Sequence, residues 1–193
     1  MLAVLAGLAA GRLRGGRLVN VTRLNPRWLP MLVLGVAAVA AARGAVLPVA
    51  AARACVVGGY LFALAALLVN LKIPWLWLAL TGGALNAVVI AANGGRMPVS
   101  AAVLRVVSRS LVLGGATGPF YVLAGPGTAL APLGDTLPLV VGGAGVVLSP
   151  GDILLAAGIA TTLQAAMVVR AEAPQPGVSS PGDPSRGNGD RPG

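Results

Sequence analysis

The side chains in this sequence that could carry out a reaction are few, and their types exclude the commonest catalytic arrangements. The chain has no histidine and a single cysteine, Cys55. No Ser-His-Asp or Cys-His pair can form, and we interpret Cys55 as a small residue buried in lipid within an apolar run. The Gly-Gly pairs do not lie between a soluble strand and a helix, so they do not predict a phosphate-binding loop. These observations predict a protein that is not an enzyme and that holds no cofactor and no metal.

A second group of polar residues has a spacing that favours a binding site. Asn86 and Asn93 are seven residues apart, so they return to the same face of a helix. Asn93 is followed by Gly94, Gly95 and Arg96, and an arginine beside the backbone amides of a Gly-Gly turn suits an anion or a lipid headgroup. The candidate binding residues are Asn86, Asn93, Gly94, Gly95, Arg96, Ser100, Asp135 and Asp152.

Asn86 also has a purely structural interpretation, which we favour. It lies in an apolar run, and Thr161, Thr162 and Gln164 lie within the last apolar run of the chain. A hydrogen bond from Asn86 to one of these side chains across a helix interface would contribute about 0.6–2 kcal/mol. The alternative is a polar ligand site between the two helices.

The acidic residues are few and also allow two interpretations. Asp135 and Asp152 are the only acidic residues before the C-terminal tail. Asp152 or Ser149 can cap the helix that follows, where exposed amides favour a carboxylate. The sharper hypothesis pairs Arg96 with Asp152 or Asp135. The Gly-Gly turn is expected to end its helix in the left-handed conformation.

The composition indicates a membrane protein. Hydrophobic residues make up 56% of the 193-residue chain and charged residues 10%, whereas a soluble domain carries about a quarter charged residues. The net charge is +9, but the basic residues form no continuous face interleaved with aromatic residues, so we do not expect nucleic-acid binding. Charge-free runs separated by basic clusters predict a multi-pass protein of the cell membrane.

The apolar runs predict an all-α, polytopic fold with about five transmembrane helices and one interfacial amphipathic helix. The expected spans are 1–10 (extended to residue 13, or shortened by a misassigned start), 28–42, 54–71, 74–92 and 152–169. Pro74 is expected in the first turn of its helix. Segment 137–148 is too short to span and is expected to form a re-entrant or surface loop or a hairpin. Residues 1–170 would form the membrane domain, and residues 171–193 a disordered tail.

Segment 100–113 differs from the spans. Arg105, Ser108 and Arg109 fall at i, i+3 and i+4, so they share one face of a helix. This pattern predicts a helix at the membrane surface, with a short helix packed over the bundle ends as the alternative. The cluster of arginines in segment 11–27 predicts that this loop and Lys72 are cytoplasmic and that residues 93–151 are outside.

Several stretches together resemble a known family. They are LTGGALNAVVIAANGGRMPVS (80–100), LGDTLPL (133–139), LSPGDILLAAGI (148–159) and GGRLVNVTRL (15–24). They are similar to the bacterial DUF5317 family of uncharacterised integral membrane proteins, over roughly residues 1–170. The resemblance implies a small multi-spanning protein and supplies no activity, substrate or cofactor.

Three functions are compatible with these features. The first is a non-enzymatic membrane protein that binds a partner or organises the envelope, its partners being membrane lipids and another membrane protein or a second copy of itself. The second is a small carrier, or a lipid- or anion-binding protein, with a polar site near Asn86, Asn93, Arg96 and Asp152. A membrane enzyme ranks last, because no general base is visible.

Overall fold

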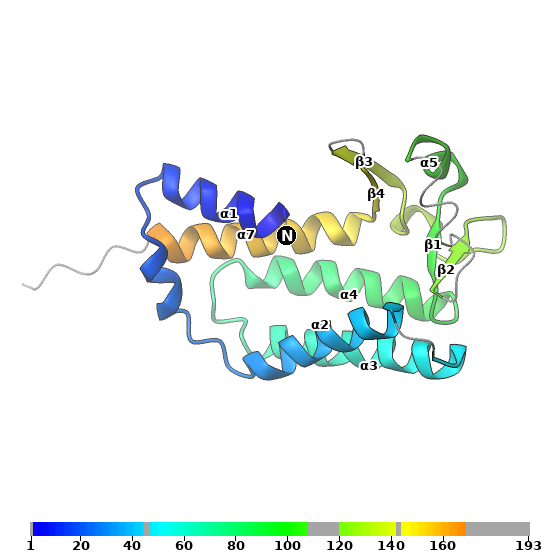
Figure 1. The fold of residues 1–193 in the computed structure, drawn as a ribbon, viewed down its shortest axis with the longest axis horizontal. Helices are drawn as coiled ribbons and strands as arrows, with labels where there is room; N and C mark the ends of the chain where they lie inside the picture. The colour runs from blue at the N-terminus through cyan, green and yellow to red at the C-terminus, as the bar shows by residue number, and fades with distance from the viewer. Residues whose placement is uncertain (1, 45–46, 108–119, 142–143, 169–193) are drawn as a thin grey trace, which may run out of the picture.

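The computed structural model describes residues 2–44, 47–107, 120–141 and 144–168. These residues form a mostly helical fold with two small sheets (Figure 1). The helices are α1 (Leu2–Leu13), η1 (Leu18–Arg23), α2 (Leu29–Gly44), α3 (Val49–Leu68), α4 (Leu76–Ala92), α5 (Ala101–Val106), η2 (Ala131–Leu133) and α7 (Pro150–Val168). The strands are β1 (Met97–Val99), β2 (Tyr121–Leu123), β3 (Leu137–Val141) and β4 (Ala144–Leu148). The prediction of an all-α fold is therefore confirmed in that the described residues are mostly helical, and wrong in that they also form two small sheets.

Five long helices lie side by side along the long axis of the molecule (Figure 1). α7 packs against α1 and α4, α4 also packs against α3, and α3 packs against α2. The last long helix of the chain thus lies between the first and the fourth. The strands and α5 gather at one end of the bundle, and η1 lies at the other (Figure 1).

Small residues let these helices approach until their backbones touch. A Cβ added to Gly82 would overlap the backbone of α7, and one added to Gly7 would lie 2.6 Å from the Ala160 carbonyl oxygen. The close pairs are Gly7 with Ala160, Gly35 with Gly59, Gly82 with Gly151, and Ala79 with Gly158. Close approach through small residues is typical of helices that pack in membranes, where van der Waals contact and not the hydrophobic effect drives association.

The helix bounds agree with the expected runs in order but differ at their ends. α3 begins at Val49, so Arg53 lies inside its second turn, whereas the expected span began at residue 54. Pro74 precedes its helix, because Trp75 adopts a left-handed conformation (φ 68°) and α4 begins only at Leu76. The prediction that Pro74 occupies the first helical turn is wrong.

The sheets form where prolines and short apolar stretches follow the helices. β1 pairs in parallel with β2, with Met97 opposite Tyr121, and Val99 also bridges to Asp135. β3 and β4 form an antiparallel pair, with Leu137 opposite Leu148. Of the alternatives offered for segment 137–148, the structure contains the hairpin. Parallel pairing of three-residue strands leaves little trace in a sequence, because the partner lies far along the chain.

The expected amphipathic helix over 100–113 is shorter in the structure. α5 ends at Val106, with Val103 and Val107 buried and Arg105 exposed. Ser108 and Arg109 lie outside the described residues, as do residues 171–193 of the expected disordered tail. The charged face predicted from Arg105, Ser108 and Arg109 therefore stays a prediction.

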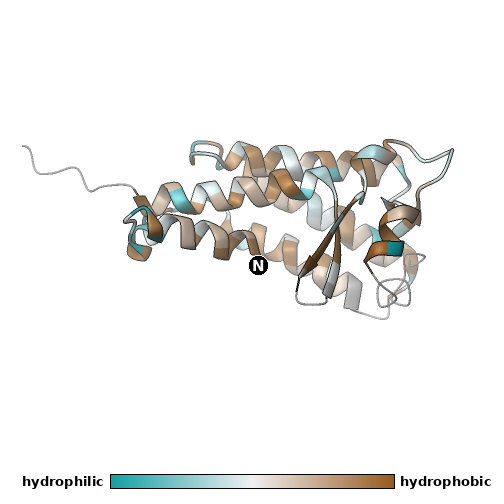
Figure 2. Cartoon of the chain, turned by 90° about the horizontal axis from the view of Figure 1, so that it is seen from above, coloured by the Kyte–Doolittle hydropathy of each residue, from teal (hydrophilic) through white to brown (hydrophobic). Residues whose placement is uncertain are grey.

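Two helices, Val49–Leu68 and Pro150–Val168, are long and apolar enough to cross a membrane by length and composition. In each, 28% of the most apolar stretch is fully buried inside the bundle, and the rest is largely exposed in α3 and half-buried in α7. The shorter apolar helices are Leu2–Leu13, Leu29–Ala42 and Leu76–Ala92. Hydrophobic residues cover the helices along their length (Figure 2).

Basic side chains and tryptophans gather at the ends of the bundle. Asn70, after α3, exchanges hydrogen bonds with the backbone of Arg27, before α2, which brings two connecting segments together at one end. The basic residues of this end are Arg12, Arg14, Arg17, Arg23, Arg27 and Lys72. The exposed tryptophans Trp28, Trp75 and Trp77 lie at the same end, where α2 and α4 begin.

Candidate functional site

The N-terminus of α7 is closed by a reciprocal cap. The Asp152 amide donates to Ser149 Oγ at 3.0 Å, and the Ser149 amide donates to Asp152 Oδ2 at 3.0 Å. This is the arrangement in which two side chains each satisfy an amide that the helix leaves without a partner. The expectation that Ser149 or Asp152 caps this helix is confirmed, with both residues taking part.

Asn86 on α4 reaches the same cap. Its Nδ2 donates to Asp152 Oδ1 at 2.8 Å, and its Oδ1 accepts from Ser149 Oγ at 2.8 Å. Asn86 and Ser149 are both buried, at 3% and 0% exposure. The hydrogen bond predicted from Asn86 to Thr161, Thr162 or Gln164 is wrong, because α7 lies in a register that places its first turn against Asn86. Thr162 instead donates to the Pro74 carbonyl at 3.0 Å.

Glycines make this contact possible. Gly151 lies directly on the Asn86 side chain, and a Cβ added there would also lie 2.7 Å from the Gly82 carbonyl oxygen. The interface between α4 and α7 is thus closed by backbone contact around a buried polar cluster. Both functional groups of Asn86 are bonded inside this cluster, so its side chain is a structural connection between two helices.

Asn93 joins a different pair of segments. Its Nδ2 donates to the carbonyls of Val89 and Ala129, both at 2.8 Å, and its Oδ1 accepts from the Ala129 amide at 3.1 Å. Asn93 therefore holds the loop after β2 against the end of α4. Although Asn86 and Asn93 are seven residues apart on one helix, the structure gives them separate partners and no common ligand site.

The Gly-Gly turn behaves as expected of a helix end. Gly94 and Gly95 have φ values of 64° and 81°, and the Gly95 amide donates to the Ile90 carbonyl at 2.9 Å. A left-handed glycine with a bond back to the last turn is the usual way of satisfying the carbonyls of a helix end. A Cβ added to Gly95 would lie 3.5 Å from Arg53 Cδ, so the turn packs against the side chain of Arg53.

Arg96 is the candidate whose side chain has a buried donor without a partner. Among the described residues, its Nε is the only buried side-chain nitrogen or oxygen without a hydrogen-bond partner. The predicted ion pair with Asp152 is not formed, because the Asp152 carboxylate accepts from Asn86 and from the Ser149 amide. The pairing of Arg96 with Asp135 stays a prediction. A buried guanidinium donor without a partner is costly and suits an anionic ligand.

Ser100 and Asp135 contribute their backbones. The Asp135 amide donates to the Pro98 carbonyl at 2.8 Å, and the Ser100 amide donates to the Asp135 carbonyl at 3.0 Å. Gly134 lies against Pro98, where a Cβ would approach the carbonyl oxygen to 2.5 Å. These residues attach the segment before β3 to β1, and Ser100 makes no side-chain cap to α5.

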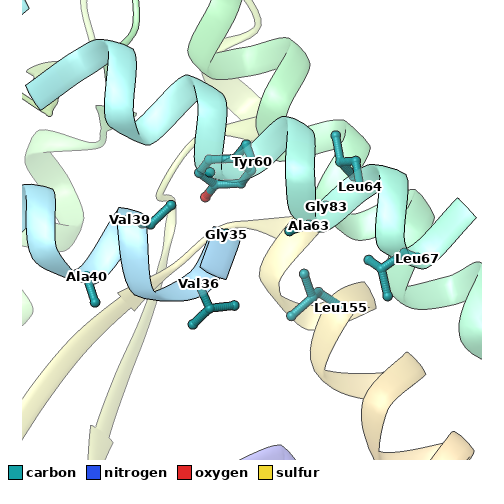
Figure 3. Close-up of a pocket in the computed structure, with 11 residues that line it drawn as sticks. Gly35, Val36, Val39, Ala40, Tyr60, Ala63, Leu64, Leu67, Gly83 and Leu155 are labelled. Carbon is teal, nitrogen blue, oxygen red and sulfur yellow. The ribbon is translucent and has the colours of Figure 1, made fainter. Parts of the chain in front are cut away.

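An apolar cavity that the sequence analysis did not foresee lies in the middle of the bundle. It has a volume of about 300 Å³ and is lined from α2, α3, α4 and α7 (Figure 3). The lining residues are Gly35, Val36, Val39, Ala40, Gly59, Tyr60, Ala63, Leu64, Leu67, Gly83 and Leu155. The glycines of this set are visible in the sequence, but only the packing of the helices shows that they leave a space.

Three of the four stretches that resemble a family meet in space, whereas 15–24 lies at the other end of the bundle. Gly151-Asp152 docks on Asn86, and Gly134-Asp135 docks on β1, so both Gly-Asp elements contact the 80–100 segment. The fold and this cluster define a helical bundle whose fourth and last long helices are joined by a cap of small and polar residues.

The family model for DUF5317, described as a family of unknown function, matches residues 21–164, and the chain belongs to this family. No curated protein and no solved structure matches the chain.

Proposed function

We propose that this protein is a multi-pass protein of the cell membrane, with α1, α2, α3, α4 and α7 in the bilayer, and that it binds another membrane component without catalysing a reaction. The main support is the distribution of side chains. Large apolar residues stand exposed along the helices, such as Leu34 at 64%, Leu61 at 62% and Val88 at 56%. In water, so large an apolar surface would cause the protein to aggregate, whereas in a bilayer the same surface contacts the lipid acyl chains.

The ends of the bundle support one orientation. The end with η1 carries six basic residues (Arg12, Arg14, Arg17, Arg23, Arg27 and Lys72). Cytoplasmic loops carry an excess of such residues, and tryptophans concentrate where helices enter the lipid headgroups. The proposed orientation therefore places η1 in the cytoplasm and the strands outside.

The polar residues between α4 and α7 are hydrogen-bonded to one another, and this favours binding over transport and over catalysis. Asn86, Ser149 and Asp152 bond to one another, and backbone contact at Gly82 and Gly151 closes the interface around them. A carrier needs a continuous polar path between these helices, and a closed interface opposes one. Partner binding or envelope organisation remains the better-supported role.

A second candidate, recognition of an anionic lipid headgroup, has its own support. The unpartnered Nε of Arg96 lies just beyond the end of α4, which is the headgroup level in the proposed orientation. The two glycines of the turn directly precede Arg96, and the side chain of Arg53 packs against Gly95. A phosphate there would meet a guanidinium whose Nε is buried and has no hydrogen-bond partner.

Alkaline carbonate washing of membranes that contain the protein tests the proposal. An integral protein stays in the membrane pellet, because its apolar surface cannot enter water. We expect the full chain to remain in the pellet, as a known multi-pass protein does in the same sample. Release into the supernatant, together with a peripheral control protein, would contradict the proposal.

A further inference from the structure

We propose that the cavity between α2, α3, α4 and α7 holds one acyl chain of a membrane phospholipid. The inference rests on the proposed placement of the bundle in the bilayer and names the ligand of a site inside it. The cavity arises because α2 packs mainly on α3, while α4 and α7 pack on each other. The face of α2 that looks toward α7 is left without a close neighbour, and Leu155 of α7 lines the far side of the space.

The lining selects an apolar occupant. Of the side chains around the cavity, only Tyr60 carries a polar atom, and the rest are aliphatic or absent (Figure 3). A water molecule needs two to four polar partners to occupy a buried space, so this lining disfavours water. Apolar cavities of this kind stay dry or take up an apolar molecule.

The dimensions favour a chain over a protein surface. The cavity volume of about 300 Å³ is at the lower end of ligand pockets. It follows α3 from Gly59 to Leu67, which corresponds to about 12 Å along the helix axis. A protein partner would need an interface of about 1,000 Å² or more, and the surface of this cavity is too small to provide one. A narrow space two helical turns long suits a flexible hydrocarbon chain.

The position of the cavity favours a lipid as the source of that chain. Gly83 lies near the middle of α4 and Gly59 near the middle of α3, and the cavity extends from there toward Leu67 at the η1 end of α3. In the proposed orientation Gly59 and Gly83 lie inside the hydrocarbon layer. Val36 and Ala40 both line the cavity and are exposed, so the space opens onto the apolar outer surface of the bundle. Acyl chains surround that opening at high concentration.

Gly83 offers a way to fill the cavity without disturbing the helices. A Cβ added there would meet only the ends of two leucine side chains, Leu64 at 3.1 Å and Leu155 at 3.6 Å. These ends can move, in contrast to the α7 backbone that faces the neighbouring Gly82. A leucine at position 83 would therefore project into the space that we assign to the acyl chain.

Native mass spectrometry of the purified full chain, exchanged into detergent containing palmitoyl-oleoyl phosphatidylglycerol, tests the inference. We expect the wild type to retain one lipid molecule per chain after mild activation. Gly83→Leu, and Ala63→Leu on the opposite helix, should each lower the retained fraction about tenfold, because the new side chain displaces two or more buried methylene groups. Val88→Leu, on the exposed face of α4, is the matched control and should retain the lipid as the wild type does.

Three results would overturn the inference. The first is a wild type that retains no lipid. The second is a Gly83→Leu or Ala63→Leu variant that melts like the wild type and still retains the lipid. The third is a retained mass that corresponds to an isoprenoid or to a second copy of the chain. If Gly83→Leu does not fold, Ala63→Leu decides the matter. A chain that resists carbonate washing but holds no phospholipid overturns this inference alone, whereas a chain released by carbonate overturns the proposed function.

Discussion

The side-chain amide of Asn86 donates a 2.8 Å hydrogen bond to the carboxylate of Asp152, across 66 residues of sequence and between two helices. Ser149 completes the cluster by donating to the Asn86 oxygen. The cluster caps α7, joins α7 to α4 and leaves neither functional group of the Asn86 side chain for a ligand. In the fold these residues connect two helices, which is the structural interpretation favoured for Asn86 from the sequence, with Ser149 and Asp152 as its partners in place of Thr161, Thr162 or Gln164.

Replacing Asn86 by alanine should weaken the bundle strongly. The substitution leaves the buried Ser149 hydroxyl without its acceptor and the Asp152 carboxylate without one of its donors, which costs about 1–3 kcal/mol in the free energy of unfolding. Thr81→Ala is the control on the same helix, because the exposed Thr81 hydroxyl bonds only within α4, to the Trp77 carbonyl. Denaturant unfolding in mixed micelles measures both variants. Equal stability of the two would show that the cluster is not a connection between helices.

A double-mutant cycle isolates the contact itself. The effects of Asn86→Ala and Asp152→Ala should fall short of additivity by about 0.5–3 kcal/mol, because each substitution already removes the same bond. Strict additivity would mean that the two side chains act independently.

The adjacent glycines of α4 should respond in opposite ways to alanine. A Cβ at position 82 overlaps the α7 backbone, so Gly82→Ala should cost about 1–3 kcal/mol or separate the helices. A Cβ at position 83 meets only movable leucine ends, and alanine favours a helix by about 0.5–1 kcal/mol over glycine. Thermal melting of the two variants should thus show a marked loss for the first and none for the second. A reversed order would contradict the register of α4 against α7.

Asn93 should control one loop and not the whole bundle. Asn93→Ala removes the bonds that hold Ala129, so amide exchange around residues 125–130 should accelerate while exchange in α4 and α7 stays unchanged. Asn93→Asp keeps an acceptor for the Ala129 amide and should give intermediate protection. Hydrogen exchange read by mass spectrometry distinguishes these outcomes, and a global loss of protection would assign Asn93 to the core instead.

Arg96 should set a preference for anionic lipid. Losing one arginine at the headgroup level should lower the retention of phosphatidylglycerol relative to phosphatidylethanolamine about fivefold in Arg96→Gln. Arg105→Gln removes an exposed arginine at the same end of the bundle and serves as the control. If both variants lose the preference equally, the effect is one of general surface charge and not of the buried Nε.

The sequence alone predicted the features that depend on residues close together in the chain. Apolar run length predicted the order of the long helices, and the caps at Gly94, Gly95, Ser149 and Asp152 follow from residue types that satisfy helix ends within one turn. These predictions need no knowledge of which helices are neighbours.

The features that the sequence did not predict depend on how distant segments meet. The partner of Asn86 is set by the register of α7 against α4, and the parallel pairing of β1 with β2 joins residues more than twenty positions apart. The left-handed Trp75 displaced the start of α4 by two residues from the expected proline. The cavity is a space that four helices leave open between them, so no single stretch of the sequence predicts it.

The central claim, that this bundle spans the membrane with η1 in the cytoplasm, is tested most directly by labelling single cysteines in intact cells. Cys55→Ala provides the background, because Cys55 is the only cysteine of the chain. Lys72→Cys reports on the end with η1, and Gly125→Cys reports on the other end, where the added side chain meets no neighbour within 4 Å. A membrane-impermeant maleimide should label position 125 in intact cells and position 72 only after the cells are opened. Labelling of both positions from outside, or of position 72 alone, would contradict the account.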